Sequence, residues 1–151
     1  MITGYTLEQL LPHDHPMILL SRFICSQADS VICEVDISAQ SPFYQADLDG
    51  VPAYVGLEYM AQTVACYAGA AALADSAAIK IGFLLGSRKY QPTVSVFADG
   101  MTLVIRAQKL VMENSGLSVF SCDISANGEM LVQANLNVFQ PENHLDWLKE
   151  S

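Results

Sequence analysis

The sequence predicts an α+β domain in which an antiparallel sheet wraps around one long central helix. The first observation is residues 51–75, VPAYVGLEYMAQTVACYAGAAALAD, a stretch that opens near Pro52 and carries one acid, Glu58, before Asp75. The second is a series of apolar, partly alternating segments on both sides of that stretch, separated by turn formers. The third is Asn127-Gly128, a strong hairpin signal, because both central positions of a type I′ turn need positive φ.

Residues 51–75 are predicted to form a helix that is buried on most of its circumference. Ala61, Ala65, Ala68 and Ala72 recur at helical spacing, and such small side chains would let the helix axis lie close to the sheet. Glu58 falls in the first turns, where a carboxylate interacts favourably with unpaired backbone amides. We expect Glu58 to be a buried acid and a candidate functional group.

The segments before this helix predict a short helix, two strands and a loop. Thr6 can cap a helix that begins with LEQLL and that Pro12 ends or closely follows. The apolar runs within residues 17–25 and 31–37 are predicted to pair as antiparallel strands. Residues 41–50 contain turn formers and aromatic residues, so they predict a loop that brings the chain to Pro52 and lies near Glu58.

The segments after the helix predict a meander of strands. Residues 79–86 form an apolar run that is too short and too flanked by glycine for a helix, and residues 93–97 alternate briefly. Longer strands are predicted over residues 101–112, 117–125 and 130–139, and the tail from 141 onward is expected to pack as a short helix or extended arm. No repeat or linker divides the chain, so we expect residues 1–151 to form one domain.

Composition argues against some functions and favours others. Charged residues are 15% of the chain and the net charge is −9, which argues against nucleic acid as a partner. Low charge with 52% hydrophobic residues suits a subunit whose surface is partly covered by another subunit. The four cysteines lack metal-ligand spacing, and the N-terminus lacks a signal-peptide pattern. We expect an oligomeric, cytoplasmic protein with reduced thiols, no metal and no inserted membrane segment.

Three stretches resemble motifs of the β-hydroxyacyl-acyl-carrier-protein dehydratases. LLPHDHPMILLSR resembles their LPHRxPxLLxDR signature, VPAYVGLEYMAQ resembles their MPGxLxxEAxAQ helix start, and FLLGSRKYQPTVSVFADGMTLVIRAQ is similar to the strand region that follows. VGLEYMAQ is also similar to the dehydratase-like subunits of aryl-polyene biosynthetic clusters. The resemblance implies a hotdog fold, usually dimeric, acting without metal or redox cofactor on acyl chains carried by the phosphopantetheine of acyl carrier protein.

The resemblance also implies roles for individual residues. Glu58 falls on the family's helix acid, Gln62 on the glutamine one turn later, and residues 52–54 on the Pro-Gly-X segment whose amide helps polarise the thioester carbonyl. Independently of the family, the amides at the helix start, those of Tyr54 and Gly56, lack partners inside the helix and could serve the carbonyl. The family's loop histidine is missing, because the matching loop, QADLDGVP, is shorter and contains none. His13 matches a histidine of the N-terminal signature; it is a candidate base, although an orienting role beside the prolines is the plainer interpretation.

Other candidates each have a plain structural alternative. Asp47 and Asp49 could act as a loop base, or could simply form the turn before Gly50. Tyr44, Tyr59 and Gln62 could line an acyl pocket, the tyrosines otherwise being ordinary core or interface aromatics. Arg88 and Lys89 could bind an acidic carrier, with Arg106 and Lys109 as the alternative patch, or could be a solvated strand end.

Three functions follow from these residues. The first is dehydration of a 3-hydroxyacyl thioester on acyl carrier protein, in fatty acid or polyketide-like and aryl-polyene synthesis. The second is a non-catalytic or half-site subunit that binds acyl chain or carrier and joins a related hotdog chain, whose histidine completes a heterodimer. The third is a hotdog acyl thioesterase, in which the helix acid activates water against the carbonyl.

Overall fold

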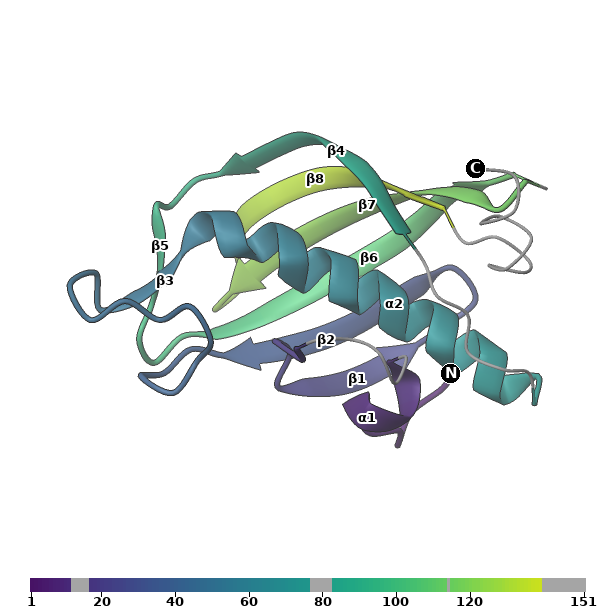
Figure 1. Cartoon of the computed structure of the whole chain (residues 1–151), viewed down its shortest axis with the longest axis horizontal. Helices are drawn as coiled ribbons and strands as arrows, with labels where there is room; N and C mark the ends of the chain where they lie inside the picture. The colour runs from purple at the N-terminus through teal and green to yellow at the C-terminus, as the bar shows by residue number, and fades with distance from the viewer. Residues whose placement is uncertain (12–16, 77–82, 114, 140–151) are drawn as a thin grey trace.

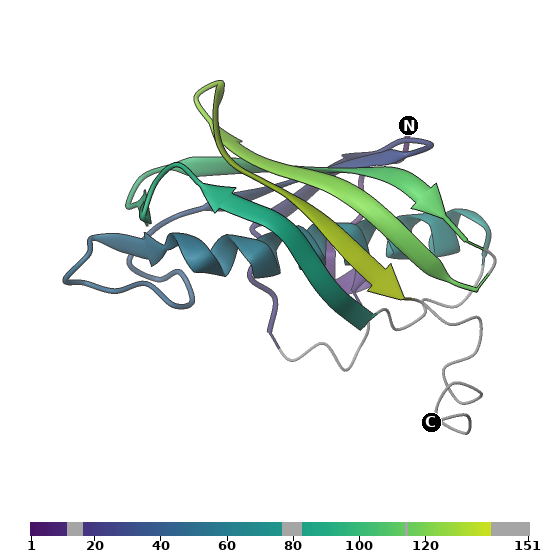
Figure 2. The ribbon, with the colours of Figure 1, turned by 90° about the horizontal axis from the view of Figure 1, so that it is seen from above.

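The computed structural model describes residues 1–11, 17–76, 83–113 and 115–139, which form a curved sheet with one long helix lying across its concave face (Figures 1 and 2). The helices are α1 (Leu7–Leu10), the 3₁₀ turn η1 (Ala53–Val55) and α2 (Gly56–Ala74). The strands are β1 (Arg22–Ser26), β2 (Ser30–Asp36), β3 (Gly50–Pro52), β4 (Phe83–Pro92), β5 (Val96–Ala98), β6 (Thr102–Met112), β7 (Leu117–Ala126) and β8 (Glu129–Phe139). This arrangement confirms the expected α+β class and hotdog fold.

The main sheet has six strands in the order β1-β2-β6-β7-β8-β4, and every pairing within it is antiparallel. Strands β6, β7 and β8 form the predicted meander, and β1 pairs with β2 as expected. Both central residues of the β7–β8 turn have positive φ, 52° at Asn127 and 80° at Gly128, which confirms the hairpin. Alternate side chains of β7, Phe120, Cys122 and Ile124, are buried in the core, whereas Ser121 and Asp123 between them lie on the other face.

The first helix begins as its sequence predicts. The Thr6 side chain accepts a hydrogen bond from Gln9 N, and Gln9 Oε1 accepts one from Thr6 N at 2.8 Å, which completes a capping box. Leu7 and Leu10 bury this turn against α2. The contact is close, because a Cβ added at Gly69 would lie 2.0 Å from the Leu10 carbonyl oxygen. Glycine is thus required there by packing.

Two strand predictions needed revision. Residues 50–52 precede the helix as a short strand, because Val51 is fully buried and pairs with Phe97 in the small β3–β5 sheet. The strand predicted over residues 79–86 continues to Pro92, and residues 77–82 lie outside the described part of the chain. Its extension through Arg88 and Lys89 was missed because polar residues on an edge strand give no apolar alternation.

The expected burial of α2 was wrong on one side. The helix covers one face of a sheet, so it buries Tyr59, Met60 and Cys66 but leaves Glu58 exposed and the alanine stripe at 61, 65, 68 and 72 only half-buried in this chain. The alanines therefore do not set the approach of helix to sheet.

Residues 1–11, 17–76, 83–113 and 115–139 include no helix with the length and apolarity to span a bilayer.

The four cysteines are free thiols, as expected, three of them buried and Cys25 half-buried. Cys33 on β2 and Cys66 on α2 lie in contact, and hydrogen bonding to Cys33 together with burial raises the pKa of the Cys66 thiol. Both side chains act as small apolar groups between helix and sheet.

Candidate active site

The candidate site lies at the N-terminal end of α2, where Glu58 occupies the first turn of the helix. The carboxylate is exposed in the single chain, and its Oε1 accepts a hydrogen bond from Gln62 Nε2 at 3.3 Å. The spacing of four residues places both side chains on the same helical face. Glu58 is thus oriented from within its own helix and remains open to a substrate or a second subunit.

Gln62 joins α2 to the segment before β1 and also contacts Glu58. Its side chain is only 2% exposed, and its Oε1 accepts from Leu19 N at 2.8 Å while its Nε2 donates to the Met17 carbonyl at 2.8 Å. The amide therefore fastens the segment before β1 to α2 and, through its weaker third contact, holds Glu58. The polar atoms of Gln62 are thus bonded to other protein groups. Its place in the wall of an acyl pocket stays a prediction.

The turn before Glu58 carries the candidate carbonyl-binding amides. Ala53 N donates to the Ser95 carbonyl at 3.0 Å, and the Gly56 N–H is directed to the carbonyls of Ala53 and Tyr54. A role for Gly56 in binding a thioester carbonyl would therefore require its amide to share or exchange these acceptors. Tyr54 is the second residue of the 3₁₀ turn, where backbone amides lack acceptors within the helix, and its side chain is 70% exposed.

Tyr90 is a residue of this site that the sequence interpretation missed. Its hydroxyl crosses from β4 and donates to the Ala53 carbonyl. Burial raises the pKa of Tyr90 to about 12, so the hydroxyl keeps its proton across the physiological range. Sequence gave no signal for it, because one aromatic residue after two basic residues looks like an ordinary strand position.

The tyrosines predicted to line an acyl pocket have different environments. Tyr59 is 1% exposed, its ring centroid lies 6.1 Å from that of Phe97, and burial raises its pKa to about 12. It fills the core beneath the helix in this chain. Tyr44 is half-buried in the loop before β3, so it is the better placed of the two for a pocket wall.

Three exposed large apolar or aromatic side chains lie in the stretch of sequence just before Glu58. Phe43 is 55% exposed and Leu48 41% exposed on the loop that precedes β3, and Tyr54 follows on η1. Figures 1 and 2 both place this loop at the end of the molecule where α2 begins. Phe43 also has a φ of 67°, an unfavourable value for an aromatic residue. These features are typical of a surface that another chain covers.

The candidate bases are less well defined. His13 lies outside the described residues. Asp47 and Asp49 are exposed on the loop, and Asp49 has a φ of 51° with its carbonyl accepting from Asp99 N at 2.9 Å, which fits the turn interpretation. Within the described ranges, no three His, Cys, Asp or Glu side chains converge on a possible metal position.

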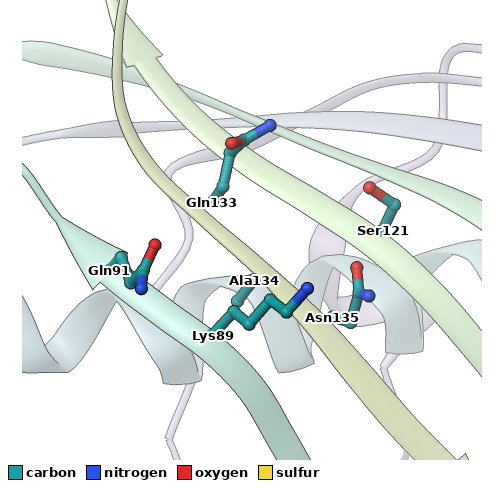
Figure 3. A pocket seen from close by; sticks show the side chains of 6 residues that line it. All are labelled: Lys89, Gln91, Ser121, Gln133, Ala134 and Asn135. Carbon is teal, nitrogen blue, oxygen red and sulfur yellow. The ribbon is translucent and has the colours of Figure 1, made fainter.

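The basic residues of β4 lie on the edge strand. Arg88 and Lys89 are exposed, and Lys89 contributes to an open pocket of about 140 Å³ on the sheet face turned away from α2 (Figure 3). The pocket is lined by Lys89, Gln91, Ser121, Gln133, Ala134 and Asn135. The alternative cations are engaged: Arg106 faces Asp123, and Lys109 Nζ lies 3.8 Å from Asp29 Oδ1 and 5.5 Å from the Tyr67 ring centroid.

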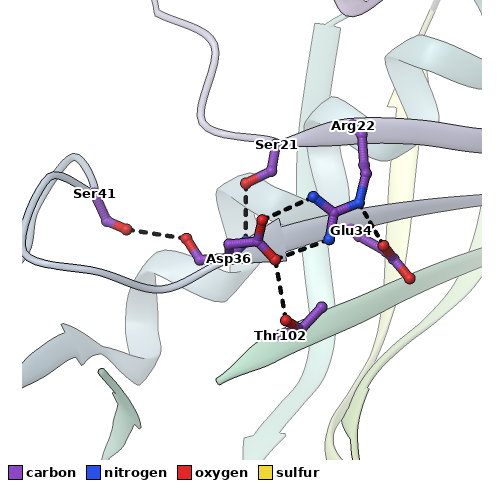
Figure 4. Close-up of polar contacts among 6 residues, drawn as sticks. All are labelled: Ser21, Arg22, Glu34, Asp36, Ser41 and Thr102. Carbon is purple, nitrogen blue, oxygen red and sulfur yellow. Dashed lines mark hydrogen bonds and ion pairs between the residues drawn. The ribbon is translucent and has the colours of Figure 1, made fainter. Parts of the chain in front are cut away.

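A second polar cluster secures the start of the loop (Figure 4). Arg22 makes a bidentate pair with Asp36 at 2.7 and 2.8 Å, and its Nε donates to Glu34 at 2.6 Å. Thr102 donates to the Asp36 carboxylate at 3.0 Å, and the Ser41 hydroxyl donates to the Asp36 backbone carbonyl at 3.2 Å. Hydrogen bonding to Arg22 lowers the pKa of Asp36. The cluster fixes β1, β2 and β6 where the chain leaves β2 for the loop.

Comparison with known proteins gives one family over nearly the whole chain. A family model described as ApeP-like, ApeP dehydratase, matches residues 5–149. The 3-hydroxyacyl-acyl-carrier-protein dehydratase FabZ of Polynucleobacter necessarius subsp. necessarius is 28% identical over 132 residues, which cover 85% of each chain. FabZ of Psychrobacter arcticus is 23% identical over 147 residues, covering 93% of this chain and 98% of the relative.

Solved structures agree with this relationship. A chain of the dehydratase heterocomplex ApeI:P from Xenorhabdus doucetiae is 30% identical with a TM-score of 0.87, covering 98% of this chain and 99% of that one. A hypothetical thioesterase from Streptococcus pneumoniae has a TM-score of 0.62 at 11% identity, covering 79% of this chain and 84% of that one. The second likeness is one of fold alone.

Proposed function

The chain belongs to the ApeP-like dehydratase family, and we propose that it takes part in removing water from a 3-hydroxyacyl group held as a thioester on acyl carrier protein. The product would be a 2-enoyl thioester, and the acyl chain would belong to aryl-polyene, related polyketide-like or fatty acid synthesis. The observation that carries the proposal is the exposed Glu58 carboxyl in the first turn of α2, directly after η1. The free thiols support a reducing compartment, which we take to be the cytoplasm.

The reaction needs three groups. A base takes the α-proton, hydrogen-bond donors stabilise the enolate oxygen that forms on the thioester, and an acid protonates the hydroxyl as the bond from carbon to oxygen breaks. The electron pair of the broken C–H bond becomes the new double bond, and the hydroxyl leaves as water. We assign the acid, or the orientation of the leaving hydroxyl, to Glu58, and stabilisation of the enolate oxygen to the Tyr54 amide.

The source of the base favours a second candidate function, that of a half-site subunit. The sequence has no histidine between residues 41 and 58, and the loop carboxylates Asp47 and Asp49 are exposed, with the Asp49 backbone held in the turn by its bond from Asp99 N. The exposed Phe43, Leu48 and Tyr54 lie around the same site and suit a covering subunit. In this version a related hotdog chain supplies the histidine, and the present chain binds the acyl group or the carrier.

Carrier recognition is proposed at the edge of the sheet. An acidic protein of net charge −9 should repel an acidic carrier overall, so docking needs local positive charge. Arg88 and Lys89 supply it on β4, and the amide and hydroxyl groups that line the pocket around Lys89 could accept further contacts. The phosphopantetheine arm would then extend from this edge toward the start of α2.

The test is turnover of a 3-hydroxyacyl carrier thioester by the pure protein and by its mixture with a related dehydratase subunit, followed by mass spectrometry for loss of water. Glu58→Gln should lower the rate by roughly 100-fold or more, because the amide cannot exchange a proton with the leaving hydroxyl. Glu8→Gln is the matched control, since Glu8 is also an exposed acid in the first turn of a helix. Equal rates for both variants would remove Glu58 from the mechanism.

The same assay separates the alternatives. Turnover by the pure protein assigns the whole reaction to this chain, whereas turnover only in the mixture, with co-purification of the two chains, assigns a half-site role. An unchanged rate on mixing together with no co-purification would contradict the mixed pair. Release of free acid in place of the enoyl thioester would select the thioesterase.

A further inference from the structure

Tyr90 lies between the two ends of the turn that leads into Glu58. Its hydroxyl donates to the carbonyl of Ala53 at the start of η1, and, against the larger effect of burial, the backbone of Leu57 in the first turn of α2 interacts with it in a way that lowers its pKa. A Cβ added at Gly56 would lie 2.3 Å from this oxygen, so the glycine leaves the space that the hydroxyl occupies. One side chain thus bridges the turn that carries the Tyr54 amide and precedes Glu58.

The edge strand is distorted where it presents this side chain. The register between β4 and β8 shifts between Arg88 and Gln91, and Lys89 has a φ of 59°. A bulge redirects the side chains next to it, and a non-glycine residue at positive φ is held there at a free-energy cost. The distortion sends Tyr90 toward the core and Lys89 to the outer face of the sheet. Figure 1 shows β4 running from the middle of α2 toward the end where α2 begins.

We propose that Tyr90 is a positioning residue for the dehydration site, and that its hydroxyl fixes the turn over residues 53–57 and with it the Tyr54 amide and the Glu58 carboxyl. A phenylalanine would fill nearly the same space among Ile124, Phe97 and Gly56, so packing alone does not require the hydroxyl. The hydroxyl is the part that donates to the Ala53 carbonyl and lies against Gly56 at the start of α2. The catalytic role rests on the proposed function, whereas the structural role does not.

The proposal also connects the sheet edge to the site. Strand β4 is the outermost strand of the main sheet beyond β8, and its bulge holds both the proposed carrier-binding lysine and the tyrosine that bridges the turn.

The test compares Tyr90→Phe with Tyr67→Phe. Tyr67 is the matched control, because its hydroxyl also donates to a backbone carbonyl, that of Ala28 at 2.5 Å, and it lies nine residues after Glu58 on α2. Amide hydrogen exchange of each pure variant reports on the turn without any need for activity. We expect faster exchange over residues 54–58 in Tyr90→Phe alone, with the remaining core as protected as in the native protein.

The kinetic part uses the active protein or complex. Tyr90→Phe should lower kcat roughly 10- to 100-fold with little change in KM, because a misplaced catalytic group weakens the transition state more than substrate binding. Tyr67→Phe should change neither by more than about twofold, as a surface-type substitution away from the chemistry. Equal exchange over residues 54–58 in the two variants would overturn the proposal, as would an equal kcat.

Substitutions of Lys89 test whether the bulge aims Tyr90. Lys89→Gly should keep the exchange pattern over residues 54–58, because glycine tolerates positive φ, whereas Lys89→Val should loosen it, because a β-branched residue does not. The reverse result would show that the bulge does not place the hydroxyl. If the native protein dehydrates no thioester, the proposed function fails, while the exchange measurements still decide whether Tyr90 fixes the turn.

Discussion

Replacing Gln62 should destabilise the protein more than any surface substitution of the same size. Gln62→Leu keeps the approximate volume but removes the partner of the Leu19 N–H and of the Met17 carbonyl, each joined to the amide at 2.8 Å. The Leu19 amide is buried, so leaving it unpaired costs about 1–3 kcal/mol, and the part-buried carbonyl adds about 1 kcal/mol. We therefore expect the free energy of unfolding to fall by about 2–4 kcal/mol.

The measurement is urea unfolding followed by circular dichroism, at one protein concentration for all variants because subunit association contributes to stability. Gln108→Leu is the control, since Gln108 is exposed on β6, and it should change the unfolding free energy by less than about 0.5 kcal/mol. A loss below about 1 kcal/mol in Gln62→Leu would show that the amide does not anchor the segment before β1.

Three further outcomes follow from named contacts. Gly69→Ala should lower stability by about 2 kcal/mol in thermal or urea unfolding, since a Cβ 2.0 Å from the Leu10 carbonyl outweighs the gain in helix propensity, whereas Gly86→Ala, with open space around it, should change little. Asp36→Asn should cost about 1 kcal/mol or less at neutral pH. Because the folded pKa of Asp36 lies below its ordinary value of 3.8, that difference should persist above pH 3.8 and vanish as the pH falls through the lower folded value, as acid-range unfolding curves would show. Replacing Arg88 and Lys89 together with Glu should weaken use of carrier-bound substrate, more strongly at low salt, and leave a short pantetheine thioester nearly unaffected; equal losses on both substrates would assign the pair to structure and move the docking site to Arg106 and Lys109.

Sequence patterns predicted the elements whose signals are local. The capping box at Thr6, the hairpin at Asn127-Gly128 and the long apolar helix each depend on residues that are close together in the chain. Glu58 and Gln62 could be paired in advance because a spacing of four brings them to one helical face. The hydrogen bond from Gln62 Nε2 to Glu58 Oε1 is likewise a contact within one stretch of helix.

The features that escaped prediction depend on contacts between distant segments. Tyr90 reaches Ala53 across 37 residues, and Gln62 reaches Met17 across 45, so neither partner is visible in any short window. The β3–β5 pairing was missed because Pro52 suggested the start of a helix, so no strand was expected at residues 50–52 to pair with the brief alternation near residues 93–97. The exposure of Glu58 follows from the helix lying on one side of the sheet, which composition alone does not reveal.

The most direct test of the account is the reverse reaction in heavy-oxygen water. The protein, alone or with its partner subunit, is incubated with a 2-enoyl carrier thioester, and the position of the heavy oxygen in the product is read by mass spectrometry. If the chain takes part in dehydration through Glu58, heavy oxygen should appear in the 3-hydroxyl of a product that is still a thioester, and Glu58→Gln should lose most of that label. Heavy oxygen found only in a released carboxylate, or labelling of the hydroxyl that Glu58→Gln leaves unchanged, would contradict the account.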